Sequence, residues 1–448
     1  MGGGTESIRL CLPKSTRGNH MVRARGLGVL AAATLLPFAF ACGGSSGGGG
    51  TASTCKPGSV AQVPAATAST AALTYAAASN ALQTTAHQGA GTVLKIGFIG
   101  ILSGQYTSYG VDEQRGAQLA LDAVNSAGGI TVGGTTYTLQ LDSQDDAADP
   151  TKGAQGATKL VDDKVVAVIG GTFSGATIAE SKIFSDNGIT QISPSATNPK
   201  YTSQGFKTAF RVVGRDDQQG PADADFIVKT LGCLNVGVMD DKSQYGQGLA
   251  DAVNAQVPVD KGTVVDREHV DATQTDFSAQ LTTMKGKNPD VIFYGGYSAQ
   301  FGPIVQQARR LGIKATFVSG DGSQDSEAIK LAGSDAEGLF ASNAGPAPSL
   351  QPGYAAFQTA YKAKYNADIF QYAPQAFDAT NIIIEAIKKA GGDKAAILAA
   401  VTATNNYQGV AQSYSFTSTG DVKISIFTIY KVESANWKAV KAINLNVS

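Results

Sequence analysis

The chain has 448 residues, enough for two or three domains of ordinary size. It carries 35 Lys and Arg against 36 Asp and Glu, so its net charge is −1 and no basic stripe indicates a nucleic-acid partner. Its three His include no pair at metal-ligand spacing, so the sequence predicts no metal site and no cofactor.

The N-terminal segment 1–42 resembles an export signal of the bacterial lipoprotein type. Two arginines follow Met21, which can serve as the start, and the apolar run Leu27–Ala41 is too short to span a bilayer. In such signals the Cys, here Cys42, is lipidated and becomes the new N-terminus. Cleavage after Ala41 without lipidation is the alternative, and both outcomes place the protein outside the cytoplasm.

Residues 43–92 are low in complexity and rich in Gly, Ala, Ser and Thr, so we expect a tether that has too few large apolar residues to form a core. Its alanine-rich part, 71–82, could form a helix. Outside the leader, Cys55 and Cys233 remain as a possible disulfide in an oxidising compartment. Two unpaired, small apolar residues are the other interpretation.

From residue 93 to residue 213, short apolar runs alternate with helical periodicity. The predicted elements are strand 93–99, helix 111–127, strand 136–142, helix 150–163, strand 165–171, a helix from Ser174 to about residue 187, strand 189–193 and strand 208–213. Ser174 stands where an N-cap would open its helix. Tyr109 falls in the loop before helix 111–127.

The alternation restarts after the polar segment GRDDQQGP, which we interpret as a crossing to a second lobe. The predicted elements are helix 218–231, strand 234–240, helix 246–256, strand 263–269, helix 276–286, strand 290–295, helix 299–312, strand 316–319, helix 325–332, strand 338–342, helices 353–365, 374–390 and 394–403, and strands 413–417 and 424–431. This order predicts an α/β protein with two doubly wound, parallel-sheet lobes and a cleft between them.

Ligands of such sheets bind at the carboxyl ends of the strands. The residues that follow these ends are Tyr109, Ser174, Ser195, Ala196 and Thr197 in the first lobe, and Tyr245, Tyr297 and Asp321 in the second. Hydroxyls and a helix N-terminus suit a carboxylate, whereas Asp321 and the ring of Tyr297 suit an ammonium group. Taken singly, Ser174 is better explained as a helix cap, and Thr197 and Asp321 as ordinary turn residues.

The chain resembles the leucine/isoleucine/valine-binding type of periplasmic binding protein, the substrate receptor of a branched-chain amino acid ABC transporter. The resemblance covers about residues 95–430. It rests on the strings IGFIGILSGQYTSYG, RGAQLALDAVNSAGGI, DSQDDAADP, ISPSATNPKYT, DDKSQYGQGLA, DVIFYGGYSAQFGPIVQQARRLG and GSDAEGL.

The resemblance implies the same contact residues as the strand ends. Ser174, Ser195, Ala196 and Thr197 would hold the carboxylate, Tyr297 and Asp321 the ammonium group, and Tyr109 and Tyr245 would flank the side chain. The family commonly has Glu where this chain has Asp321. Some members have a disulfide at the positions of Ala148 and Phe173, so Phe173 is expected to reshape the pocket wall.

The resemblance also implies the fold known as the type I periplasmic binding protein, or Venus flytrap, with a three-strand hinge. The hinge crossings fall near Gly214, near 343–344 and around Phe427, which makes 93–214 with 344–426 the first lobe and 215–343 with 427–448 the second. The implied partners are an amino acid and the permease and ATPase of an ABC transporter. The receptor would be a monomer in the periplasm or at the cell surface, lipid-anchored to the membrane.

Other functions are either disfavoured by the sequence or stay open as alternatives. An enzyme is disfavoured because no G-x-S-x-G elbow, Walker loop or G-x-G-x-x-G fingerprint follows a predicted strand, and a Ser-His-Asp site would need His269 from a charged segment. A sensor subunit of the same fold is an alternative, as is a binder of amides or aromatic acids. A sugar is disfavoured because the single Trp437 lies past the last predicted strand.

Overall fold

The computed structural model describes residues 55, 56 and 91–446. All of them fall within one compact unit of the chain. The predicted leader, Cys42 and the predicted helix at 71–82 lie outside the described residues.

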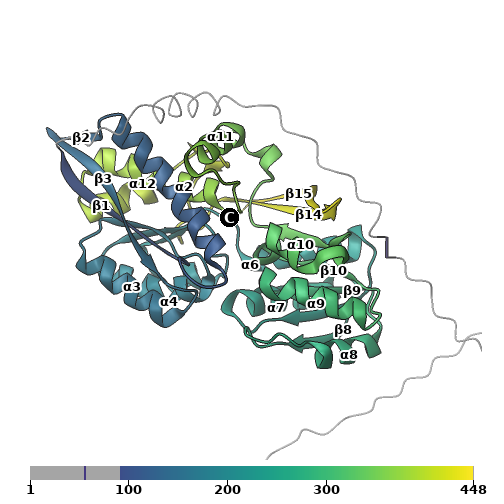
Figure 1. Cartoon of the computed structure of the whole chain (residues 1–448). Coiled ribbons are helices and arrows are strands. Elements are labelled where there is room, and N and C mark those ends of the chain that lie inside the picture. The colour runs from purple at the N-terminus through teal and green to yellow at the C-terminus, as the bar shows by residue number, and fades with distance from the viewer. Residues whose placement is uncertain (1–54, 57–90, 447–448) are drawn as a thin grey trace, which may run out of the picture. The chain divides into compact units, whose positions relative to one another are not determined.

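The first lobe is built on a sheet of order β2-β3-β1-β4-β5-β6 (Figure 1). Its strands are β1 (Thr92–Gly100), β2 (Ile130–Val132), β3 (Thr135–Asp145), β4 (Ala167–Gly170), β5 (Thr190–Ser193) and β6 (Ala209–Arg211). All neighbours are parallel except β2, which pairs antiparallel with β3 at the edge. Because the central strands are parallel, their carboxyl ends meet at one rim.

Helices cover both faces of this sheet. They are α2 (Thr107–Ser126), α3 (Pro150–Asp162), α4 (Ser174–Asp186), α5 (Lys200–Ser203), α11 (Tyr354–Tyr365), α12 (Ala373–Ala390) and α13 (Lys394–Thr402). Ile96 and Phe98 of β1 point into a core with α2 and α12, whereas Ile99 packs with Leu160 and Phe184 of α3 and α4. This alternation is the period of two expected of a strand that is buried on both faces.

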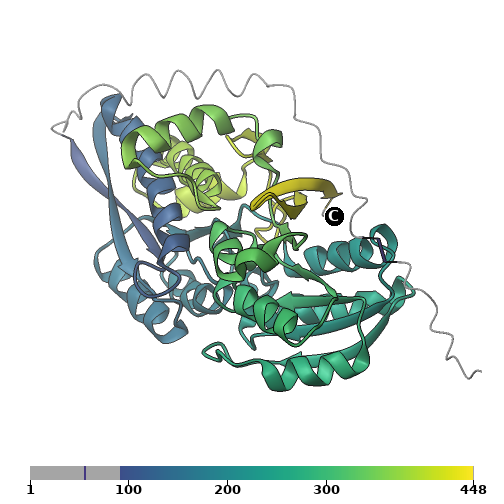
Figure 2. The same ribbon diagram turned by 45° about the vertical axis from the view of Figure 1, so that its right-hand side comes forward.

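The second lobe is built on a sheet of order β15-β14-β11-β10-β9-β7-β8. Its strands are β7 (Asn235–Asp240), β8 (Thr263–His269), β9 (Val291–Gly295), β10 (Thr316–Ser319), β11 (Phe340–Asn343), β14 (Ile424–Glu433) and β15 (Asn436–Asn446). β14 pairs antiparallel with β11 and with β15, and the pair of β14 and β15 is drawn in yellow in Figure 2.

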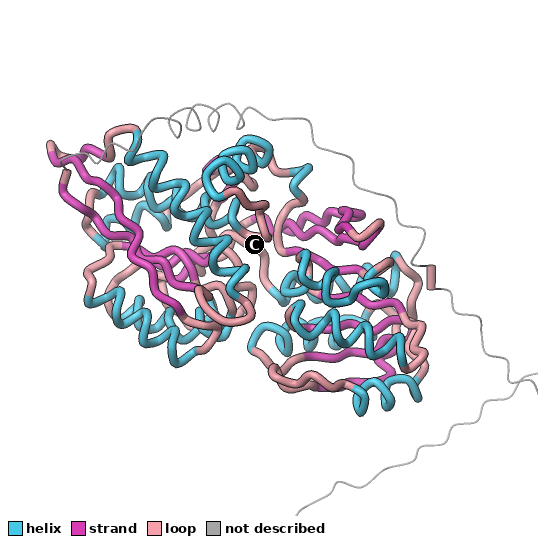
Figure 3. Tube along the Cα trace, viewed as in Figure 1, coloured by secondary structure: helices cyan, strands magenta, loops and turns pink. Residues whose placement is uncertain are grey.

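The helices of the second lobe also lie on both faces of its sheet (Figure 3). They are α6 (Asp216–Asp225), which continues as a π-helical turn at Phe226–Thr230, α7 (Gln244–Val259), α8 (Ser278–Lys287), α9 (Ser298–Arg310) and α10 (Ser326–Ala332). Val291 and Phe293 of β9 pack toward α6 and α7, and Ile292 and Tyr294 toward α8, α9 and α10. Short 3-10 turns lie at Asp321–Ser323, Gly333–Ala336 and Pro348–Leu350, and β12 (Tyr407–Gln408) pairs with β13 (Ser413–Tyr414).

The structure corrects several element predictions. α2 begins at Thr107, so Tyr109 lies in the first turn of the helix and not in a loop. β2 and β15 were not predicted, and Trp437 lies in β15 and not past the last strand. The sheets of the two lobes are therefore not parallel throughout. An antiparallel hairpin forms one edge of each sheet, β2–β3 in the first lobe and β14–β15 in the second.

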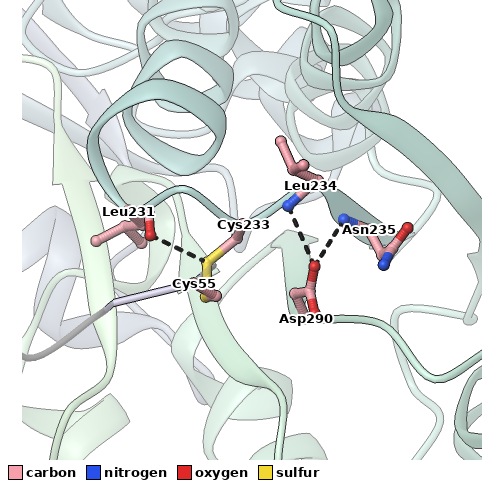
Figure 4. The surroundings of a disulfide bond; sticks show 6 residues. All are labelled: Cys55, Leu231, Cys233, Leu234, Asn235 and Asp290. Carbon is pink, nitrogen blue, oxygen red and sulfur yellow. Dashed lines mark hydrogen bonds between the residues drawn. A yellow bond between two sulfur atoms is a disulfide. The ribbon is translucent and has the colours of Figure 1, made fainter. Parts of the chain in front are cut away.

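A disulfide joins Cys55, in the short described segment before β1, to Cys233, which follows the π-helical turn (Figure 4). Beside it, the Lys56 amide donates to the Leu231 carbonyl at 2.7 Å. Asp290 accepts hydrogen bonds from the Leu234 and Asn235 amides, which holds the start of β7 next to this crosslink. The segment that precedes the first lobe is thus bonded to the second lobe.

Candidate functional site

The first wall of the site comes from the carboxyl ends of β4 and β5. The N-cap of α4 is Phe173 and Ser174 is its first helical residue, so the predicted role of Ser174 as N-cap is wrong. Its Oγ instead accepts from the Asn198 amide at 3.2 Å. The Ser195 Oγ donates to the Thr172 carbonyl at 2.9 Å.

The second wall follows β9 and β10, with α7 behind them. Tyr297 is the N-cap of α9, Asp321 opens a 3-10 turn after β10, and Tyr245 lies in the first turn of α7. A Cβ on Gly322 would lie 2.6 Å from the Tyr245 ring and 2.9 Å from the Tyr297 ring. Only glycine therefore lets this turn pack so closely against both tyrosines.

The two walls enclose a cavity of about 20 Å³, which is room for about one water molecule. It is lined by Tyr109, Thr172, Phe173, Ser174, Ser195, Thr197, Tyr245, Tyr297, Asp321, Gly322, Gln371 and Tyr372. The structure thus brings together all the predicted ligand contacts except Ala196. The Ala196 amide already donates to Ser193 Oγ at 2.9 Å, and its carbonyl accepts from Arg211.

Asp321 is the centre of the polar network in the second wall. It is 4% exposed, and its carboxylate accepts hydrogen bonds from Tyr245 (2.9 Å), Gln219 (3.0 Å) and Tyr372 (3.2 Å). Burial raises the pKa of Asp321, and the hydrogen bonds from Tyr245 and Gln219 act against that rise by stabilising the anion. A charge held this way in a buried site favours a cationic group next to it.

The first wall has a different electrostatic character. The Thr197 hydroxyl is 1% exposed and makes no hydrogen bond of normal geometry. It lies close enough to the Asp216 carboxylate to lower the pKa of that group, although burial and the nearby Asp321 raise that pKa well above its usual value overall. The N-terminus of α4 adds a positive dipole end beside Ser174, so this wall suits an anion.

Hydrogen bonds join the two lobes directly across the site. The Tyr109 hydroxyl contacts the Asp325 carboxylate, the Gly322 carbonyl at 2.8 Å and Ser298 Oγ at 3.1 Å. The Gln371 amide donates to the Asp321 carbonyl at 2.6 Å. Burial, together with the charge of Asp325, raises the pKa of Tyr109 well above its usual value, so its hydroxyl stays neutral at physiological pH. The lobes are therefore in the closed arrangement.

Sequence reasoning expected Phe173 in the pocket wall, but it missed Thr172, Gln371 and Tyr372, which also line the cavity. Thr172 lies two positions before Ser174 and could have been found by applying the strand-end rule to every residue after β4. Gln371 and Tyr372 precede α12 and follow no strand, so no local signal marked them.

Two features are absent from the part of the chain that the structure describes. No group of three or more His, Cys, Asp and Glu side chains there could hold a metal ion. No helix among residues 91–446 is both long and apolar enough to cross a membrane.

Comparisons with known proteins agree with this geometry. A family model described as periplasmic binding protein matches residues 93–436. The leucine-, isoleucine-, valine-, threonine-, and alanine-binding protein of Pseudomonas aeruginosa is 32% identical over 345 residues, which cover 76% of this chain and 90% of that protein. Leu/Ile/Val-binding protein homolog 1 of Brucella suis is 34% identical over 338 residues, which cover 75% and 89% of the two chains.

A solved structure is similar over the same region. It is the branched-chain amino acid transporter substrate binding protein LivJ from Streptococcus pneumoniae in complex with isoleucine. The TM-score is 0.73 at 32% identity, and the match covers 79% of this chain and 100% of that one.

Proposed function

Because the chain belongs to the periplasmic binding protein family, we propose that it is the extracytoplasmic substrate-binding receptor of an ABC importer. Its ligand is an α-amino acid, with the branched-chain aliphatic amino acids as the first candidates. The relatives from Pseudomonas and Streptococcus support this class of ligand. The proposed function is binding, and no catalytic step is assigned to it.

The observation that carries the proposal is the cavity with a hydroxyl wall on one lobe and a buried acid on the other. In the proposed pose, Ser174, Ser195 and Thr197 hold the carboxylate of the amino acid at the start of α4. Asp321 and the face of Tyr297 hold its ammonium group. Ala196 supports this wall from behind, because its amide donates to Ser193 and its carbonyl accepts from Arg211.

The proposed mechanism is closure of the lobes around the ligand. The amino acid first binds the hydroxyl wall, and the second lobe then adds Asp321 and Tyr297. Only contacts that exist in the closed state favour closure, so these two residues should control it. The lobe boundaries at residues 214, 343 and 426 stay a prediction.

The proposed location is the periplasm or the cell surface, where the closed receptor meets a membrane permease and its ATPase as a monomer. The leader and the disulfide support an oxidising compartment outside the cytoplasm. We further propose that Cys42, which lies outside the described residues, carries a lipid anchor. Mass spectrometry of the mature N-terminus tests the lipid directly.

The ligand is tested by calorimetry after a thermal-shift screen against the twenty amino acids. Asp321→Ala should weaken binding of the best ligand at least about 30-fold, because truncating one partner of a buried charge pair costs about 2–5 kcal/mol. Asp321→Asn keeps the shape of the side chain and should show most of the same loss if charge is the cause.

Asp368→Ala is the matched control, because it removes a carboxylate that is 78% exposed on the surface of the protein. Its affinity should equal that of the wild type. Unchanged affinity in Asp321→Ala, or a wild type that binds no amino acid in the screen, would refute the proposed ligand class.

A further inference from the structure

Phe173 holds a fixed position beside the proposed carboxylate site. It is the N-cap of α4, with φ of −94° and ψ of 138°, and it directly precedes Ser174. Its carbonyl accepts hydrogen bonds from the Thr177 amide at 3.1 Å and the Thr177 hydroxyl at 2.9 Å. These bonds fix the backbone, so the direction in which the Phe173 side chain leaves the helix is fixed as well.

The Phe173 ring crosses from the first lobe to the second. It stacks on the Tyr297 ring with centroids 3.8 Å apart and an interplanar angle of 13°. The edges of Tyr106 and Tyr109 meet it at centroid distances of 5.2 and 5.3 Å. Tyr297 also contacts the Tyr245 ring, with centroids 5.1 Å apart and an interplanar angle of 36°. Phe173 is therefore enclosed by aromatic rings and is only 8% exposed.

The Phe173 ring forms part of the cavity wall, together with the proposed ligand-binding residues. Ser174 and Asp321 line the same cavity as Phe173, yet the volume of this cavity is only about 20 Å³. An amino acid held by both groups must place its side chain among the rings around them. A short side chain displaces little, whereas a long one must first separate Phe173 from Tyr297.

On the basis of the proposed function, we propose that Phe173 is a specificity-determining residue that limits the length of the ligand side chain. The site then favours short aliphatic side chains, of the size of alanine and valine, over leucine and phenylalanine. Separating a stacked aromatic pair weakens binding by about 2- to 10-fold before any steric cost is added. Because Phe173 and Tyr297 belong to different lobes, their stack exists only when the lobes are closed. The limit on side-chain length therefore applies in the closed state.

The experiment measures Kd by calorimetry for alanine, valine, leucine and phenylalanine with the full chain. The readout is the ratio of the Kd for alanine to the Kd for leucine. In Phe173→Ala this ratio should rise at least 10-fold relative to the wild type, because the space of the ring becomes available to the longer side chain. Phe173→Leu should give a smaller rise in the same direction, and it serves alone if the alanine variant does not fold.

The matched control is Phe370→Ala. The Phe370 ring packs against Tyr109 at 4.8 Å in the same aromatic cluster but does not line the cavity. This variant should keep the ratio within about twofold of the wild type. An unchanged ratio in the folded Phe173 variants overturns the inference and leaves the proposed function intact. A wild type that binds none of the four amino acids overturns the proposed function and the inference with it.

Discussion

At the scale of single residues, the first wall of the site depends on a buried acid, Glu113, that does not itself line the cavity. Glu113 of α2 is 1% exposed and accepts a hydrogen bond from the Thr172 hydroxyl at 2.8 Å. The Thr172 carbonyl in turn accepts from Ser195. Burial raises the pKa of Glu113 to about 8, while the nearby hydroxyls of Ser195 and Thr172 limit the rise. Glu113 is therefore mostly neutral at pH 7 and positions the residues in front of it.

This raised pKa predicts a pH dependence of stability. The folded protein keeps a proton on Glu113 that the unfolded chain releases above its ordinary pKa of about 4.5, so stability falls as pH rises from there to about 8. Glu113→Gln keeps an acceptor for Thr172 and removes this loss. The variant should gain about 1–3 kcal/mol over the wild type between pH 5 and pH 8.5 in denaturation experiments.

The control for this prediction is Glu337→Gln, which changes an exposed acid. Its stability should follow the wild type at every pH. A constant difference between Glu113→Gln and the wild type across this pH range would show that Glu113 does not carry the proton.

At the scale of elements, the segments that are predicted to cross between the lobes pack against one another. Val213, Ala344, Tyr372 and Phe427 form a small buried cluster. The Gly214 amide donates to the Ala344 carbonyl at 3.4 Å, which links the first predicted crossing to the second. Tyr372 also reaches Asp321, so this cluster is connected to the site. Movement at the crossings and occupancy of the site should therefore be coupled.

Gly214 makes this packing possible through close approach. A Cβ at this position would lie 2.3 Å from the Phe427 ring, so Gly214→Ala should destabilise the protein by about 1–3 kcal/mol. Combining it with Phe427→Leu should recover part of that loss, because the clashing ring is gone. Denaturant unfolding of the single and double variants measures the coupling.

Gly286→Ala in α8 is the comparison, since nothing lies within 4 Å of its Cβ position. Gly286 is the penultimate residue of α8, so alanine should stabilise the protein by at most about 0.5–1 kcal/mol, the value for the middle of a helix. Equal effects at the two glycines would mean that contact with Phe427 is not the reason for Gly214.

At the scale of the whole molecule, the disulfide determines where the N-terminal segment is attached. Cys55 precedes the first lobe in sequence, but it is bonded to Cys233 of the second lobe across a separation of 178 residues. Any anchor at Cys42 would therefore hold the receptor through its second lobe. Without the disulfide, the same anchor would hold it through the start of β1 in the first lobe.

Loss of the disulfide should lower stability by about 2–5 kcal/mol, because crosslinks of this kind constrain the unfolded chain. Thermal unfolding with and without dithiothreitol measures this effect. The double variant Cys55→Ala, Cys233→Ala should unfold at the temperature of the reduced wild type, both with and without dithiothreitol. If dithiothreitol reduces both cysteines but does not change the midpoint of thermal unfolding of the wild type, the prediction is contradicted.

The sequence by itself determined the alternation of strands and helices, the two lobes and the strand-end residues from Tyr109 to Asp321. These follow from local periodicity and from the rule that parallel strands present their carboxyl ends at one rim. The family resemblance rested on local strings in the same way, and the family match confirms it. The proposed ligand contacts of these residues stay a prediction.

Only the tertiary structure decided the rest. Tyr372 reaches Asp321 from a segment that follows no strand, and Phe173 meets Tyr297 across the lobes. The burial of Glu113 behind Thr172 likewise depends on residues that are far apart in the chain. The physical reason is that periodicity records which face of an element is apolar, whereas the partner of that face is chosen by the packing of the whole chain.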